Sequence, residues 1–133
     1  MSKNTVVILV FTDGKKVLVE KRQLQQFTTL QYLIPGGTVK DFEKLEQALI
    51  REAKEELGIK LLEFSILPHQ KITGLNGQLL KPFLIHKWEG KISETILDKG
   101  NPLFWVEFDE ALTSLVYPTR QVVEALKKYL ALE

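Results

Sequence analysis

Three glutamates crowd one short segment of the sequence. Glu52, Glu55 and Glu56 share an arc of about 100° on a helix, because successive residues turn by about 100°. The apolar residues of the same segment fall beside this arc, so the carboxylates border the buried face. Like charges at this spacing repel each other. The cluster is therefore either a crowded solvated surface or a set of hard oxygen ligands for Mg²⁺ or Mn²⁺.

The residues around the cluster favour the metal site. Counting from Gly37, the order is a glycine, five residues, Glu43, seven residues and then Arg51, which directly precedes the first glutamate of the cluster. Gly58 and an apolar residue close the pattern. This arrangement over residues 37–59 resembles the Nudix box without a gap, and the chain is similar to the small MutT-like nucleotide pyrophosphohydrolases of that family.

The resemblance implies an enzyme that uses Mg²⁺ or Mn²⁺ to hydrolyse a nucleoside diphosphate linked to another group X. Water that attacks phosphorus needs charge neutralisation, a polarised phosphoryl group and activation, and divalent ions supply all three. The implied metal ligands are the Gly36 carbonyl, Glu52, Glu55 and Glu56. Besides Glu52 and Glu55, the implied catalytic residues are Arg51 and Glu43, as a pair that orients the site, and one acid after the box. That acid is Glu94 or Asp98, and the sequence does not choose between them.

Six residues are candidates for holding the nucleotide: Arg22, Tyr32, Gly36, Gly37, Trp88 and Thr119. Arg22 ends a predicted strand where MutT-like proteins carry an arginine that contacts phosphate. The two glycines would let the backbone approach the phosphates closely. Tyr32 and Trp88 are candidates for stacking on the base, with ordinary core packing as the alternative. Thr119 would contact the base or sugar, with helix capping as the alternative. MutT itself has an asparagine in this neighbourhood, and its absence here argues against specificity for an oxidised guanine.

The substrate class follows by elimination among the branches of the family. The marks of the ADP-ribose, diadenosine polyphosphate, NADH and coenzyme A branches are absent. The remaining class is a nucleoside or deoxynucleoside triphosphate cut to the monophosphate and pyrophosphate. The alternatives are an ADP-ribose, dinucleoside polyphosphate or nucleotide-sugar pyrophosphatase, and a non-catalytic nucleotide-binding module. The presence of all the box carboxylates favours an enzyme over a binding module.

The order of apolar runs and turn residues predicts how these side chains are positioned. Strands are predicted at 6–11 and 17–19 as a hairpin, at 32–34, at 61–67, at 79–88 and at 103–106. Residues 35–37 should form a tight turn, and Pro82 should place its strand at a sheet edge or bulge. Helices are predicted at 42–57 and 119–132. The expected fold is α+β, a single Nudix-type α/β/α sandwich over residues 1–133, with a mixed sheet and helices on both faces.

Composition excludes several other classes of protein. The 133 residues are 44% hydrophobic and 26% charged, and the absence of cysteine excludes disulfides and thiolate metal sites. The net charge of +1 gives no support to a protein that coats nucleic acid or a membrane surface. The longest apolar run, at 6–11, is far shorter than the roughly 20 residues that cross a bilayer. We expect a soluble cytoplasmic monomer or homodimer that binds a small nucleotide, with no stable nucleic-acid partner and no membrane association.

Overall fold

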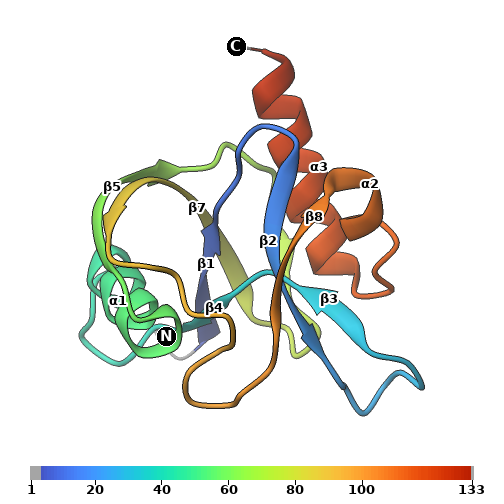
Figure 1. Ribbon diagram of the computed structural model, residues 1–133, viewed down its shortest axis with the longest axis horizontal. Coiled ribbons are helices and arrows are strands. Elements are labelled where there is room, and N and C mark those ends of the chain that lie inside the picture. Colours follow the sequence, from blue (N-terminus) through green and yellow to red (C-terminus); the bar gives the residue numbers. More distant parts are fainter. Residues whose placement is uncertain (1–3, 133) are drawn as a thin grey trace.

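A computed structural model describes residues 4–132 of the chain. Figure 1 shows α1 and α3 on opposite sides of the strands. The elements in order are β1 (Thr5–Val10), β2 (Lys16–Arg22), β3 (Gln31–Leu33), β4 (Gly36–Thr38), α1 (Leu45–Glu52), the π-helical turn η2 (Ala53–Leu57), β5 (Lys60–Ile66), β6 (Ile72–Thr73), β7 (Leu79–Glu89), β8 (Leu103–Glu107), α2 (Phe108–Ala111) and α3 (Tyr117–Ala131).

The larger sheet has five strands and is mixed. Its order is β4-β1-β7-β5, and β6 also pairs with β7. Strands β1 and β7 run parallel, whereas the other neighbours run antiparallel. In the β1–β4 pair, Val7 lies opposite Gly37 and Ile8 lies opposite Gly36. This register places the two glycines on an edge strand that leads toward α1.

The smaller sheet has three antiparallel strands in the order β3-β2-β8. Glu20 of β2 lies opposite Leu33 of β3, and Arg22 lies opposite Gln31. The loop after β1 turns sharply, since the Asp13 side chain accepts hydrogen bonds from the two backbone N–H groups that follow at 15 and 16. Strands β1 and β2 are neighbours in the sequence, but they belong to different sheets.

Alternation along the strands divides the core into two layers. On β1, Val7 and Leu9 face the layer that contains Leu49 and Leu57 from α1 and the π turn. The intervening β1 residues, with Leu84 of β7, face the layer that contains the buried residues of α3. A strand covered on both faces reads as a continuous apolar run, which explains the sequence of β1. The predicted α+β fold, a mixed sheet with helices on both faces, is confirmed.

Two local predictions need correction. The expected hairpin is wrong, because β1 pairs with β4 and β7, whereas β2 pairs with β3 and β8. Among the described residues, an isolated bridge joins Thr12, just after β1, to Val17 of β2, and the N–H of Leu18 donates to the Phe11 carbonyl. The expected tight turn at 35–37 is also wrong, because Gly36 and Gly37 belong to a strand and neither has a positive φ.

Pro82 lies in a central strand, not at an edge or bulge as predicted. Strand β5 pairs with β7 as far as Phe83, and β6 pairs with β7 only from Leu80 backwards. Pro82 falls in the gap between these two partners, where its carbonyl accepts the N–H of Leu67 at 3.0 Å. The missing N–H of proline is tolerated because no strand on that side requires it.

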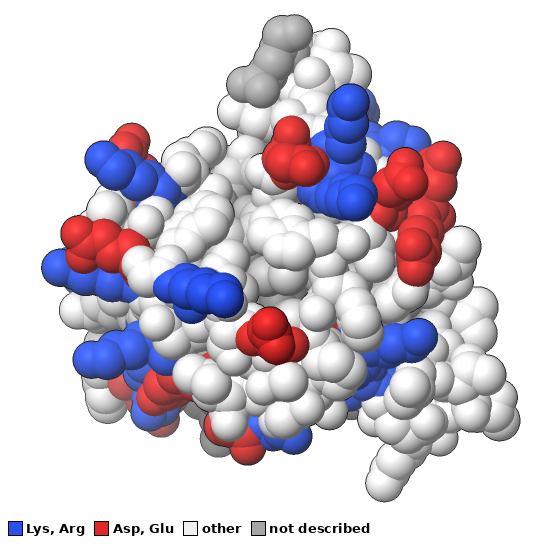
Figure 2. Space-filling model, in the orientation of Figure 1, with Lys and Arg blue, Asp and Glu red and all other residues white. Residues whose placement is uncertain are grey.

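Charged side chains on the face in Figure 2 are interspersed. Blue and red side chains lie next to one another in several places, mainly around the rim, and much of the face is uncharged. Helix α2 carries Asp109 and Glu110 in its first turn, and acidic residues near a helix N-terminus are stabilised by its dipole.

Candidate active site

Arg51 uses its whole guanidinium to hold the acidic residues around it. Its Nε and NH2 groups donate to the two carboxylate oxygens of Glu43 at 2.8 and 2.9 Å. Its NH1 group donates to Glu52 Oε1 at 2.7 Å and to Glu55 Oε1 at 3.0 Å. NH2 also donates to the Thr38 carbonyl at 3.0 Å, so each guanidinium N–H has an acceptor. The predicted Arg51–Glu43 pair is present, and the bond from Arg51 to the Thr38 carbonyl ties α1 to β4.

This pair is ionised over the whole physiological range. The Arg51 guanidinium lowers the pKa of Glu43 to about 2, and the hydrogen bond from the Lys40 backbone acts in the same direction. The carboxylates raise the pKa of Arg51 in turn, chiefly through Glu43. A planar guanidinium that grips a carboxylate with two bonds fixes direction as well as distance. Arg51 therefore gives Glu52 a defined position.

Gly37 provides the space in which the Glu52 carboxylate lies. A methyl group at position 37 would overlap the carboxylate carbon and both carboxylate oxygens of Glu52. The glycine is thus required for close approach and not for a turn conformation. At Gly36, the same methyl group would instead overlap the backbone carbonyl of Val7. Gly37 therefore makes room for the Glu52 carboxylate, and Gly36 makes room for the backbone of the neighbouring strand.

Glu56 lies buried beside Glu52. The two residues are 6% and 8% exposed, whereas the Glu55 side chain is 51% exposed. Burial, followed by the charge of Glu52, raises the pKa of Glu56 to about 8, while Lys99 acts in the opposite direction. Two neighbouring buried carboxylates form a strong site for a cation.

The helix turn that carries Glu56 is a π turn, which the sequence did not predict. Residues 53–57 form η2, and the N–H of Gly58 donates to the carbonyls of Ala53 and Lys54. Gly58 then ends the helix in the left-handed conformation with a φ of 71°. Single π turns inside α-helices are frequent at functional sites. This one begins directly after Glu52 and carries Glu56.

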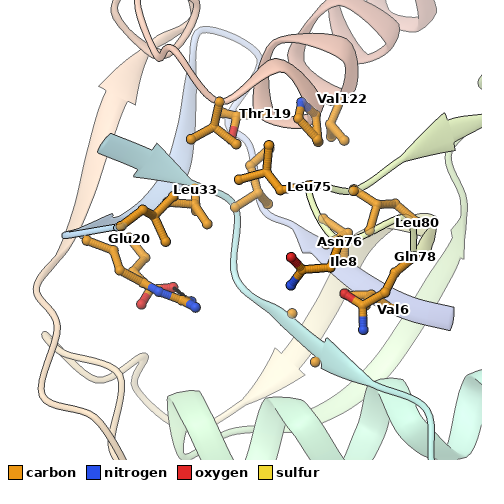
Figure 3. Close-up of a pocket in the computed structure, with 18 of the residues that line it drawn as sticks. Val6, Ile8, Glu20, Leu33, Leu75, Asn76, Gln78, Leu80, Thr119 and Val122 are labelled. Atoms are coloured by element: carbon orange, nitrogen blue, oxygen red, sulfur yellow. Dashed lines mark ion pairs between the residues drawn. The ribbon is translucent and has the colours of Figure 1, made fainter. Parts of the chain in front are cut away.

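Two hollows meet at β4. An acidic cleft of about 630 Å³ is lined by the three glutamates of the cluster together with Asp98 and Lys99. A pocket of about 280 Å³ lies beside it, and its walls combine aliphatic side chains from β1, β3, β7 and α3 with polar ones from β2, the β6–β7 turn and α3. Both hollows are lined by Gly36, Gly37, Thr38 and Lys99. Figure 3 shows Thr119 and Val122 on one side of the pocket and Asn76 and Gln78 on the other.

The structure brings some of the predicted residues into these hollows. Arg22 and Thr119 line the pocket, and Asp98 lines the cleft. Glu94 is exposed and does not line either hollow, although its carbonyl accepts the N–H of Leu103. Of the two acids that the sequence left open, Asp98 is therefore the one beside the cluster. Thr119 does not cap a helix, because α3 begins at Tyr117 after the N-cap Val116.

The two aromatic candidates lie elsewhere. Trp88 packs edge-on against Phe11, with ring centroids 5.1 Å apart, on the core layer that faces α1. The hydroxyl of Tyr32 donates to Glu110, and its ring lies under the Lys21 ammonium. Neither ring is among the groups that line the pocket, so the assignment of these rings to base stacking is not carried forward. Only the backbone carbonyl of Tyr32 reaches the pocket wall, through its bond with Thr119.

Two residues of the site were missed from the sequence. Glu20 is buried at 4% exposure, lines the pocket, and accepts a hydrogen bond from Asn101 Nδ2 at 2.8 Å. Its other oxygen lies 3.7 Å from Arg22. Lys99 lines both hollows. The signal for Glu20 was an acid directly after the apolar run at 17–19, but nothing local marked Lys99.

The donor set fits a divalent metal ion of the magnesium type. Among the described residues, no three acidic or histidine side chains converge tightly enough to enclose an ion by themselves. Mg²⁺ does not need such a cage, because it keeps several waters and is commonly held by one or two carboxylates and the substrate phosphates. Glu52 and Glu56 are two buried carboxylates of that kind, and the glycine beside Glu52 keeps the approach open.

Comparison with known proteins identifies the family of the chain. A model of the NUDIX domain family matches residues 1–126, so the chain belongs to this family. The 8-oxo-dGTP diphosphatase of Buchnera aphidicola subsp. Schizaphis graminum is 27% identical over 129 residues, which cover 96% of either chain. Nucleoside triphosphatase NudI of Escherichia coli is 38% identical over 69 residues, or 51% of this chain and 49% of NudI. The E. coli ORF135 solution structure has a TM-score of 0.77 at 24% identity and covers 97% of this chain and 91% of its own.

The protein is thus a Nudix hydrolase that acts on a pyrophosphate bond of a nucleotide, as its box predicted. Members of this family generally use divalent metal ions such as Mg²⁺. Within residues 4–132, no helix is both long and apolar enough to cross a membrane.

Proposed function

We propose that this enzyme hydrolyses a nucleoside or deoxynucleoside triphosphate to the monophosphate and pyrophosphate. The observation that carries the proposal is the junction of two hollows at Gly36 and Gly37. The pocket on one side, which combines aliphatic walls with polar groups, suits a base and sugar, whereas the acidic cleft on the other side suits metal-bound phosphates. A nucleotide laid across the glycines would place the phosphates nearest the nucleoside at the carboxylates.

Each residue then has a distinct role. Glu52 and Glu56 would hold Mg²⁺ or Mn²⁺, with Glu55 and the Gly36 carbonyl as further ligands. When bound, the ion supplies charge neutralisation and an activated water. Arg51 holds Glu52 in place and is itself held by Glu43. Asp98 is the acid after the box that stands nearest to the cluster, and it is the better candidate for taking up a proton from water.

Two cations are available for the phosphate chain. Arg22 lines the pocket near Glu20, and Lys99 lines both hollows. Cationic groups that face the transferred and leaving phosphates stabilise the charge that develops there. We also propose that the protein works as a soluble cytoplasmic monomer or homodimer built from a single domain, with no stable nucleic-acid partner. The names of the relatives, an 8-oxo-dGTP diphosphatase and a nucleoside triphosphatase, support a triphosphate substrate.

The products identify the substrate class. Purified enzyme is incubated with Mg²⁺ and a panel of triphosphates, ADP-ribose, a dinucleoside polyphosphate and a nucleotide sugar, and pyrophosphate and orthophosphate are assayed separately. We expect equal amounts of monophosphate and pyrophosphate from triphosphates, and no turnover in excess EDTA. Orthophosphate with the nucleoside diphosphate, or turnover confined to the other three substrates, would contradict the proposal. Binding of triphosphates without turnover of any substrate would indicate a binding module instead.

A further inference from the structure

The hydroxyl proton of Thr119 is already used in a hydrogen bond within the protein. The residue is 4% exposed and lines the pocket from the first turn of α3. Its Oγ1 lies 2.9 Å from the carbonyl oxygen of Tyr32. A carbonyl can only accept, so the hydroxyl must be the donor in this bond. A hydroxyl has one proton and two lone pairs, and Thr119 Oγ1 therefore has only acceptor capacity left.

The Tyr32 carbonyl holds this arrangement from the other side. It belongs to β3, which pairs with β2, so its position is fixed by the smaller sheet. The same carbonyl oxygen also accepts the Ser114 hydroxyl at 2.8 Å. Ser114 does not line the pocket. Two hydroxyls of the same kind thus bind one carbonyl, but only Thr119 also reaches the nucleotide pocket.

The polar groups opposite Thr119 lack a fixed direction. Asn76 and Gln78 come from the β6–β7 turn and lie on the other side of the pocket (Figure 3). A side-chain amide carries both donors and an acceptor and can turn to present either. Around Thr119 the wall is aliphatic, with Val116 and Val122 as neighbours on the same segment. Thr119 is therefore the group in this part of the pocket that constrains which atom of a base can face it.

We propose that Thr119 makes the pocket select nucleobases that carry an amino group, and not a carbonyl oxygen, at the 6-position of a purine or the 4-position of a pyrimidine. The amino group of adenine or cytosine can donate an N–H to the free lone pair of Thr119 Oγ1. Hypoxanthine and uracil have a carbonyl oxygen at the same position, which can only accept. Two hydrogen-bond acceptors that face each other in a site with little water are unfavourable. A site therefore discriminates strongly against a substrate that leaves its polar groups unpaired. This inference rests on the proposed function, because it takes the pocket to be the base site of a nucleotide hydrolase.

The test compares bases that differ at this group. The affinities of CMP against UMP and of AMP against IMP are measured by calorimetry, and kcat/KM is measured for the matching triphosphates. The triphosphates of 2-pyrimidinone riboside and purine riboside, which lack the amino group but keep the ring nitrogen of cytosine or adenine, complete the set. We expect the amino-bearing member of each set to be favoured by at least about tenfold, the value of one good hydrogen bond.

Thr119→Val should remove this preference by weakening binding of the amino-bearing bases, and Thr119→Ser should retain it. The valine variant should fold, because the Tyr32 carbonyl keeps its bond from Ser114. Ser114→Ala is the matched control, since it removes the other bond to the same carbonyl at a position outside the pocket. We expect it to lower Tm and to leave the base preference unchanged.

The outcomes separate this inference from the proposed function. A preference in monophosphate binding that Thr119→Val abolishes supports the inference even if triphosphates are not hydrolysed, in which case only the proposed function fails. Equal affinity for both members of each pair, or a preference that survives Thr119→Val, overturns the inference even if triphosphates are hydrolysed. A Thr119→Val variant that loses stability with an unchanged base ratio would show a purely structural threonine and would also overturn it.

Discussion

Gly36 and Gly37 face different obstacles, so the same substitution should have different results at the two positions. In Gly37→Ala, the new methyl meets the far end of the flexible Glu52 side chain, which can move aside. Folding should survive, but a displaced Glu52 loses the hydrogen bond from Arg51. We expect kcat to fall by about a hundredfold, because a misplacement of one ångström can have that effect. Steady-state kinetics and thermal unfolding of the same preparation check this.

Gly36→Ala is the contrasting variant. Its methyl meets the backbone carbonyl of Val7 in the neighbouring strand, which cannot move aside without disturbing the sheet. The free energy of unfolding should fall by about 1–3 kcal/mol, as overpacking in a well-packed region does. If Gly37→Ala destabilises the fold as much as Gly36→Ala and keeps its activity, then Gly37 serves the sheet and not the carboxylate.

Residues whose role follows from local spacing could be predicted from the sequence. Glu52 and Glu56 lie close together because they are one helical turn apart, and Arg51 meets Glu43 across the short loop before the helix. Glu20 and Lys99 lie far from the box in the chain, and only strand pairing brings them to the site. Their role therefore depends on the topology of the sheets, which the sequence pattern does not specify.

At the scale of elements, the turn between Ile96 and Asn101 places Asp98 and Lys99 beside the cluster. The Ile96 N–H donates to the Asn101 carbonyl at 2.8 Å, which closes the turn. The Asn101 side chain donates to the buried Glu20 carboxylate on β2. This bond fastens the turn to the smaller sheet.

Asn101→Ala should release the turn. Removing the donor leaves a buried carboxylate without that partner, so the free energy of unfolding should fall by about 1–3 kcal/mol. The measurement is urea unfolding of Asn101→Ala, Glu20→Gln and the double variant. We expect the asparagine substitution to have a smaller effect in the Glu20→Gln background, because contacting residues are not additive. Fully additive losses would mean that Glu20 and Asn101 do not act together.

The element predictions failed where two sequence-adjacent strands belong to different sheets. A turn at 12–14 between two apolar strands is typical of a hairpin, and the turn itself is present. The strands nevertheless separate, because β1 has β4 and β7 as neighbours. The assignment of Trp88 to the base site failed for the same reason. Strand order decided that its ring would meet Phe11 in the core layer that faces α1.

At the scale of the whole molecule, metal binding and folding should be linked through Glu56. Its pKa is raised to about 8 from the ordinary value of 4.5, so the native state holds a proton that the unfolded chain has lost. Without metal, the contribution of this group to stability is present below about pH 4.5 and declines as pH rises toward about 8. Because the metal ion binds the ionised form of Glu56, it restores the stability that is lost as pH rises.

We therefore expect saturating Mg²⁺ to raise Tm more at about pH 8.5 than at about pH 6, because at the lower pH a proton competes for Glu56. Thermal unfolding across this range, with and without Mg²⁺, measures the difference. Glu56→Gln should remove the pH dependence of the shift, since an amide does not titrate here. An identical shift at both pH values in the unmodified protein would contradict the assignment of Glu56 as a ligand.

Glu52 and Glu56, positioned by Arg51 and given space by Gly37, form the metal-dependent catalytic centre that we propose. The most direct test is the rate of pyrophosphate release from a triphosphate by Glu52→Gln, Glu56→Gln and Lys54→Gln at saturating Mg²⁺. Lys54 lies between the two glutamates in sequence but is exposed on another face of the helix. Each glutamate variant should fold and lose at least about a hundredfold in kcat, whereas the lysine variant should stay close to the unmodified enzyme. Equal losses at all three positions, or activity retained in either glutamate variant, would contradict the account.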